Sequence, residues 1–194
     1  MKKCLFIGPK YFDYYIDIKE NIEKEGYIVY YYPDQIINKT SDIILKKIFK
    51  NYKKNKMDKY TKKICISIDK SIDVVFIILA YDFFPENIKE LKRTFIKAKF
   101  VYYAWDSIKN FPIIELLARE CDKVYSFDPH DCKTHDYKFL PLFFVKKGCA
   151  NEKKFDCCTI MNFYPSKSEG LKKILKIIPP NSNIFKYLVL KSRL

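Results

Sequence analysis

The stretch "DVVFIIL" at residues 73–79 decides the fold class, because it runs apolar from Val74 to Leu79 without a polar break. Such a continuous run is typical of a strand that is buried on both faces of a parallel sheet. In the segment that follows, "AYDFFPENIKELKRTF", Pro85 suits the first turn of a helix, and Ile88, Leu91 and Phe95 recur at helical spacing. These residues predict a strand followed by a helix.

The same order recurs along residues 1–145. Strands are predicted at 3–8, 27–32, 99–105 and 122–127, each bounded by turn residues or a helical pattern. A long lysine-rich helical pattern covers residues 36 to 70, and we expect two helices there with a break near "NKMDK" at 55–59. Repeated strand-then-helix order predicts a doubly wound, Rossmann-like parallel sheet of at least five strands with right-handed crossovers.

A second α/β domain is predicted to begin after a polar linker at residues 146–154. Within 155–194, "FDCCTIM" predicts a strand, "LKKILKII" a helix and "IFKYLVL" another strand. One β-α-β unit is too small to cover both faces of a sheet, so we expect this domain to be incomplete.

The formal net charge of +14 comes almost entirely from lysine, since Arg93, Arg119 and Arg193 are the only arginines. Nucleic-acid readers favour arginine for bidentate contacts, so we expect no nucleic-acid partner and favour peripheral contact with an anionic membrane surface. The seven cysteines have no C-x-x-C spacing, and no signal peptide or apolar run of about 20 residues is visible. These features predict a reduced, cytoplasmic protein, with the inner face of the membrane as its place of contact.

The carboxyl ends of the predicted strands should share one edge, which is where open α/β sheets bind ligands. We expect Gly8, Pro9, Trp105, Asp106, Ser107 and Asp128 to line this edge. Asp106, Asp128 and Asp13 are the candidates for a general base. A structural alternative stays open, in which Asp106 or Ser107 caps the next helix and Trp105 fills a gap beneath it.

Other ligand signals are weak. His130 and His135 lie in the polar segment "FDPHDCKTHD", but their spacing matches no zinc motif, so a polar loop is favoured and no metal is expected. Gly8 stands without the further glycines of a G-x-G-x-x-G fingerprint, so no cofactor is expected.

The segments "FIGPKYFDYY" (6–15), "YYAWDSIKN" (102–110), "KVYSFDPHDC" (123–132) and "YLVLKSRL" (187–194) resemble CgeB-like glycosyltransferases of bacterial capsule and lipopolysaccharide biosynthesis clusters. The resemblance implies a GT-B arrangement of two Rossmann-like domains. It also implies that the N-terminal domain receives a sugar acceptor, which can be lipid-linked, and that the C-terminal domain binds a nucleotide-sugar donor without a metal.

The chain departs from this family in the second domain. Where family members place a glycine and then an arginine, this sequence has Met161-Asn162 and Ser168-Glu169-Gly170. We therefore expect an acceptor-side half, either a fragment or a degenerate copy, that transfers no sugar alone. The alternative is a non-catalytic α/β partner-binding or regulatory module. A receiver-like module would need an acidic pair after the first strand, and "FIGPK" has none.

Overall fold

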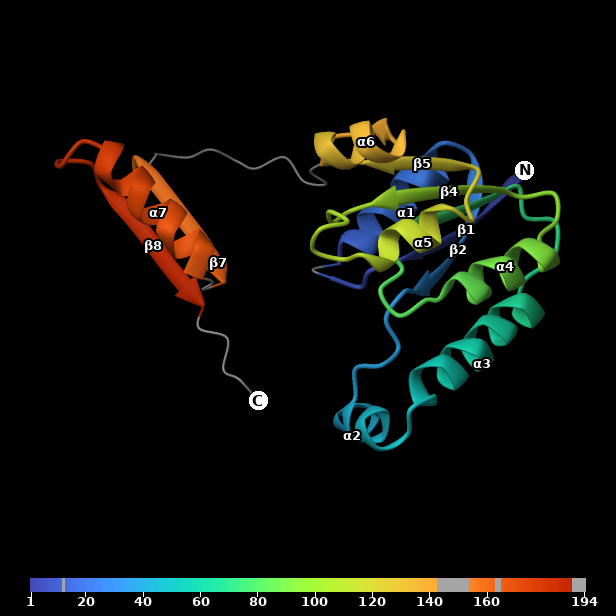
Figure 1. Ribbon diagram of the computed structural model, residues 1–194. Coiled ribbons are helices and arrows are strands. Elements are labelled where there is room, and N and C mark those ends of the chain that lie inside the picture. The colour runs from blue at the N-terminus through green and yellow to red at the C-terminus, as the bar shows by residue number, and fades with distance from the viewer. Residues whose placement is uncertain (12, 143–153, 163–164, 190–194) are drawn as a thin grey trace. The chain divides into compact units, whose positions relative to one another are not determined.

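The computed structural model describes residues 1–11, 13–142, 154–162 and 165–189. The chain divides into two compact units, Met1–Val145 and Lys146–Leu194. Each unit is described by itself (Figure 1). Among the described residues, no helix combines the length and the apolar character that crossing a membrane requires.

The first unit is an α/β domain built on a six-stranded parallel sheet, as the alternation of strands and helices predicts. Its strands, in the spatial order β2-β1-β3-β4-β5-β6, are Tyr27–Pro33, Lys2–Gly8, Val74–Ile78, Lys99–Ala104, Lys123–Ser126 and Lys138–Phe139. The connecting helices are α1 (Tyr14–Lys24), α2 (Thr40–Ile48), α3 (Tyr52–Ser67), α4 (Pro85–Thr94), α5 (Ile113–Ala118) and α6 (Pro129–His135).

Apolar side chains cover both faces of this sheet. On one face, Leu5 and Ile77 of the strands join a large core with residues of α3, α4 and α5, including the fully buried Ile64 and Leu91. On the other face, Phe6 and neighbouring strand residues pack against residues of α1. The central strands therefore have no solvated face, which explains why they lack polar alternation.

The structure corrects two sequence predictions in this unit. Residues 55–59 lie within the unbroken helix α3, and the break falls instead at Phe49–Asn51, where Phe49 has extended backbone angles. The segment containing both histidines is not a loop, because α6 occupies Pro129–His135. Asp128 caps that helix with its side chain, and Pro129 has the fixed φ angle that suits a first helical turn.

The second unit has the predicted strand-helix-strand order. β7 (Cys157–Asn162) and β8 (Ile184–Val189) form a two-stranded parallel sheet, and α7 (Pro165–Ile177) connects them. Asp156 stabilises the start of the unit by accepting a hydrogen bond from the Asn183 N–H at 2.8 Å. That this unit begins a donor-binding domain stays a prediction.

Candidate functional site

The strand order places a topological switch point between β1 and β3. After β1 the chain crosses to β2 on one side, whereas after β3 it crosses to β4 on the other side. The loops that follow β1 and β3 therefore diverge, which is the arrangement that creates ligand sites in flavodoxin-like sheets. Gly8, Trp105 and Asp128 each lie at or just after a carboxyl end, so the prediction that they share one edge is confirmed, and Ala80 lies at the same edge after β3.

Asp34, directly after β2, connects the loops at this switch point. Its backbone N–H donates to the Gly8 carbonyl at 3.1 Å, and its carbonyl accepts from the Asp82 N–H at 3.2 Å. Its Oδ2 accepts from the Tyr81 N–H at 2.9 Å. One buried residue thus holds together the chain segments that follow β1, β2 and β3.

The loop that Asp34 holds is conformationally strained. Leu79 and Ala80 both have left-handed backbone angles, with φ of 63° and 55°. Such angles are unfavourable for residues with a side chain and persist only where neighbouring contacts impose them. Here the Ala80 N–H donates to the Ile78 carbonyl at 2.7 Å, and Asp34 fixes the next amide, that of Tyr81.

The Asp34 carboxylate is unusual for its burial. The residue has no exposed surface, and its Oδ1 atom is buried without a hydrogen-bond partner among the described residues. Burial raises the pKa of Asp34 to about 6, since water no longer solvates the charge. The nearby Asp82 carboxylate raises this pKa further, while the hydrogen bond from the Tyr81 amide opposes the shift.

Asp82 is the second buried acid at this edge, and it is paired with a lysine. Its Oδ1 lies 3.1 Å from Lys53 Nζ in the first turn of α3. Its Oδ2 accepts from the backbone N–H groups of Ile36 and Ile37 at 2.9 and 3.1 Å. Lys53 also donates to the Tyr81 carbonyl at 3.3 Å and lies 5.7 Å from the centre of the Tyr81 ring.

An aromatic rim lies along the same edge of the sheet as these charged groups. We give this name to Tyr11, Tyr14, Tyr81, Trp105 and Phe111, which follow the carboxyl ends of β1, β3 and β4 and are all at least partly exposed. Tyr81 and Phe111 are stacked, with ring centres 5.0 Å apart and planes 9° apart. The Tyr14 and Trp105 rings lie 6.0 Å apart. The rim offers flat apolar faces beside polar groups.

Tyr11 is bonded to Gln35, the residue that follows the buried Asp34. Its hydroxyl donates to Gln35 Oε1 at 2.7 Å, and 44% of the residue is exposed. Partial burial and the charge of Asp34 raise the pKa of the Tyr11 phenol, so the group remains a neutral donor and acceptor at physiological pH.

Gly8 and Pro9 are both buried at this edge. A Cβ atom on Gly8 would lie 2.7 Å from Cε2 of the Phe6 ring, which is too close for any side chain. The Gly8 carbonyl accepts a hydrogen bond from the Tyr31 hydroxyl at 3.0 Å. The glycine is therefore required here by packing within the protein.

Asp106 and Ser107 form a hydrogen-bonded turn after β4. Asp106 Oδ1 accepts from the Ser107 N–H at 2.8 Å and from Asn110 Nδ2 at 3.0 Å. Ser107 is 8% exposed. Trp105 is half-buried and packs against the core that α1 covers. The next helix, α5, begins at Ile113 with Pro112 before it and no side-chain cap, so the alternative in which Asp106 or Ser107 caps that helix is wrong.

The remaining candidate bases differ in their surroundings. Asp128 Oδ1 accepts from the His130 N–H at 2.8 Å and caps α6. Asp13 is exposed, occupies the position before α1 with a left-handed φ of 59°, and makes no capping hydrogen bond with its side chain. In the part of the chain that the structure describes, no group of three or more His, Cys, Asp and Glu residues could hold a metal ion.

Sequence reasoning missed Asp34, Asp82 and Lys53. Asp34 follows the strand predicted at 27–32 and Asp82 lies in the segment after the strand predicted at 73–79, but neither residue was singled out. The available signal was that both aspartates follow strands of the predicted sheet. Their mutual contact depends on β2 and β3 flanking β1, which local patterns do not specify.

Comparison with known proteins gives little further information. No family model matches the chain, and no curated protein matches it. Among solved structures, a response regulator from Thermotoga maritima is similar at 12% identity and a TM-score of 0.39, with 91% of this chain and 99% of that chain covered. A TM-score this low supports no inference about function.

Proposed function

We propose that the first unit is the acceptor-binding half of a glycosyltransferase-like protein of cell-surface polysaccharide biosynthesis, of the capsule or lipopolysaccharide type. The observation that carries the proposal is the aromatic rim at the β1/β3 switch point, with Lys53 and the acids Asp34 and Asp82 beside it. The resemblance of four segments to CgeB-like enzymes supports the same function and suggests a GT-B arrangement.

The chemistry of the rim suits a sugar. Pyranose rings have an apolar face that stacks on aromatic rings, and hydroxyl groups that need hydrogen-bond partners at the sides. The Tyr81–Phe111 pair and Trp105 offer such faces, while Tyr11 and Gln35 offer a phenol and an amide. A neutral or weakly charged saccharide therefore fits this edge better than a nucleotide, whose diphosphate needs unpaired cations or an open helix N-terminus.

A general base must reach the acceptor hydroxyl directly or through one water. Asp13 is the exposed carboxylate among the three candidates, in the loop between β1 and the rim residue Tyr14. Asp106 and Asp128 each use one oxygen to cap their own turn, and Asp34 is buried. We assign the base role to Asp13 within this proposal, and a positioning role to Asp34.

Donor binding would fall to the second unit. Its sequence has Met161-Asn162 and Ser168-Glu169-Gly170 where CgeB-like enzymes have a glycine and an arginine. Without the arginine, a departing diphosphate loses a group that would neutralise its charge. We therefore propose that the chain binds an acceptor saccharide but does not by itself transfer sugar from a nucleotide-sugar.

Trp105 makes this testable, because it is the only tryptophan and lies in the rim. Neutral oligosaccharide fragments of bacterial capsules and lipopolysaccharides should change its fluorescence saturably when titrated into the purified chain. Tyr81→Ala should weaken the binding at least about tenfold, since one good stacking contact contributes about 1.5 kcal/mol.

The matched control is Tyr27→Ala, a half-buried aromatic at the amino end of β2, on the opposite edge of the sheet. This control should leave the binding constant unchanged. Equal losses in both variants, or no saturable response to any saccharide, would contradict acceptor binding at the rim. Nucleotide-sugars should give no hydrolysis, and measurable turnover would show that a donor site exists.

A further inference from the structure

The helix α2 has an inverted amphipathic character. Its single buried residue is Asp42, which lies at the interface with α3. Ile43, Ile44 and Ile48 are instead 51%, 52% and 65% exposed. At about 100° per residue, these three isoleucines lie within an arc of roughly 140° on one side of the helix.

A polar anchor maintains this orientation. Tyr52 donates a hydrogen bond of 2.6 Å to Asp42 Oδ1, and Lys56 forms an ion pair with the same oxygen. These two hydrogen bonds lower the pKa of Asp42 to about 2, with that from Lys56 contributing most. The helix is thus attached to α3 through its aspartate, and its isoleucines point away from the attachment.

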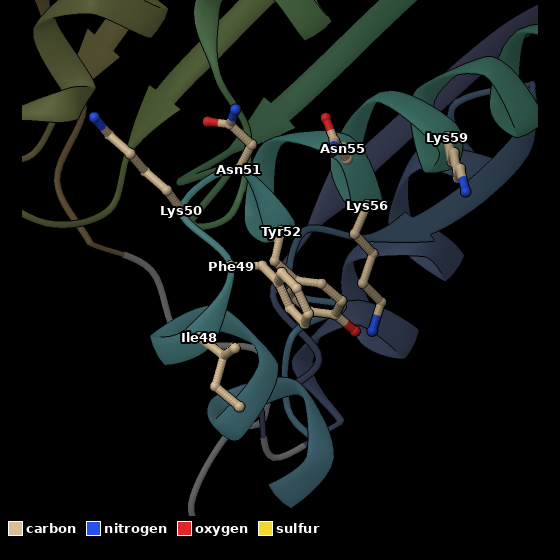
Figure 2. Close-up of a pocket in the computed structure, with 8 residues that line it drawn as sticks. All are labelled: Ile48, Phe49, Lys50, Asn51, Tyr52, Asn55, Lys56 and Lys59. Carbon is tan, nitrogen blue, oxygen red and sulfur yellow. The ribbon is translucent and has the colours of Figure 1, made fainter.

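The apolar surface continues into a cleft between α2 and α3. Figure 2 shows Phe49 and Tyr52 in the centre of the view, Ile48 on the α2 side, and Lys50 and Lys59 projecting toward either end. The cleft has a volume of about 730 Å³, and Phe49 is 57% exposed. In Figure 1, α2 lies beyond the end of α3 and away from the sheet.

The charge around this surface is high and one-sided. Residues 39–63 contain ten lysines, two aspartates and no arginine, so more than half of the net charge of +14 lies in this segment. No acidic side chain in the described residues pairs with Lys46, Lys47, Lys50 or Lys59. We call these lysines, with Ile43, Ile44, Ile48 and Phe49, the basic apolar patch.

We propose that the basic apolar patch binds the surface of an anionic lipid bilayer. Exposed isoleucine and phenylalanine side chains can enter the boundary between headgroups and acyl chains, while unpaired lysines contact anionic headgroups. An apolar arc beside lysines without arginine fits a lipid surface better than nucleic acid, where arginine and base-stacking aromatics dominate. If the apolar residues served only to bind the hydrophobic surface of another protein, the excess positive charge around them would have no explanation.

The patch lies next to the candidate site. Lys53, in the first turn of α3, forms the ion pair with Asp82 at 3.1 Å, and α2 follows the carboxyl end of β2. A bilayer on the patch would therefore be close to the edge that carries the aromatic rim. The lipid proposal stands without the proposed function, because it uses residues of α2, of the turn into α3 and Lys59 of α3, none of which belongs to the rim.

Vesicle flotation with the full chain tests the proposal. The chain should float with phosphatidylglycerol vesicles and remain in solution with phosphatidylcholine vesicles. The double variant Lys47→Gln with Ile48→Asp should bind phosphatidylglycerol vesicles at least about tenfold more weakly. One lysine near an anionic surface contributes about fivefold to binding, and burial of the isoleucine side chain in the bilayer contributes the rest.

The matched control is Lys97→Gln with Ile96→Asp, since Ile96 is 82% exposed and precedes β4 at the opposite edge of the sheet. Melting temperatures of both variants should equal that of the parent chain, because all four residues are exposed. No flotation with anionic vesicles, or equal loss in both variants, would overturn the proposal. Tight binding to single-stranded RNA would also overturn the proposal, if that binding depended on the patch lysines and was unchanged by Ile48→Asp alone.

Discussion

At the scale of single residues, Asp34 shows how a buried carboxylate can hold the backbone of a candidate site in place. Its side chain fixes the strained turn after β3 through the Tyr81 amide, and its Oδ1 atom lacks a partner in the described residues. A buried, partly satisfied carboxylate lowers stability at neutral pH. Such a residue is retained for the geometry that it imposes, here on the rim residue Tyr81.

The raised pKa of Asp34 predicts a specific pH dependence. Folded, Asp34 titrates near pH 6, whereas in the unfolded chain it titrates near about 4. Between these values the folded state holds the extra proton, so the free energy of unfolding should fall as pH rises, by about 3 kcal/mol in total. Asp34→Asn should lack this component in urea unfolding measured from pH 4 to 7.

Asp69→Asn is the control with the opposite sign. Hydrogen bonds from Lys3 and Ser71 hold the pKa of Asp69 below its usual range. The stabilisation from that group is present above the unfolded pKa and is lost as pH falls. Its removal should therefore lower the free energy of unfolding by a constant amount well above the unfolded pKa, and should remove a pH dependence on the acid side alone. If Asp34→Asn follows the parent curve from pH 4 to 7, Asp34 does not titrate as described.

Gly8 supports a second prediction at this scale. An alanine there would place its Cβ 2.7 Å from the Phe6 ring and 3.5 Å from Ile78 Cβ, and Phe6 is fully buried. Overpacking of this kind costs about 1–3 kcal/mol, so Gly8→Ala should lower the urea midpoint clearly. Gly170→Ala, where an added Cβ meets nothing within 4 Å, should not. An unchanged midpoint for Gly8→Ala would show that the strand can shift to accept the methyl group.

At the scale of elements, α6 positions the loop that carries Trp105. Asp131, in its first turn, is 3% exposed, and its Oδ2 accepts a hydrogen bond of 2.8 Å from the Ile108 N–H. The α6 helix thereby fastens the turn of Asp106 and Ser107 to the end of β5. The segment that was expected to be a polar loop therefore has a structural role as a short helix.

Asp131→Ala should loosen this turn. A buried N–H without its acceptor costs about 1–3 kcal/mol, and amide hydrogen exchange at residues 106–110 should accelerate accordingly. Asp128→Ala removes the cap of α6 without touching Ile108, and should cost about 1 kcal/mol. Similar exchange at residues 106–110 in the two variants would mean that the Asp131 bond does not hold the loop.

The comparison of sequence and structure is also clearest at this scale. The sheet could be predicted because β1, β3 and β4 are buried on both faces and each precedes a helical pattern. The break between α2 and α3 could not, because lysines and apolar residues alternate alike on both sides of Phe49. The roles of Asp34 and Asp82 were missed because they depend on contacts between strands that are distant in sequence.

At the scale of the whole molecule, the two units should differ in stability. The first has a six-stranded sheet with fully buried residues on both faces, whereas the described residues of the second form two strands and one helix, with Ile174, Ile177 and Phe185 exposed. A two-stranded sheet is marginally stable in water. In native-state hydrogen exchange, amides of β7 and β8 should exchange at least about a hundredfold faster than those of β1, β3 and β4. Equal protection would show that the units unfold together.

The central claim is that the switch-point edge of the first unit binds a saccharide, and the location of binding tests it most directly. Chemical-shift mapping by NMR should be recorded on the isotope-labelled chain with the saccharide that gives the strongest Trp105 fluorescence response. Our account predicts that the shifts concentrate on the amides of Tyr11, Tyr81 and Asp82 and on the Trp105 indole N–H. Shifts confined to the opposite edge, around Tyr27 and Ile96, or to the second unit, would contradict it.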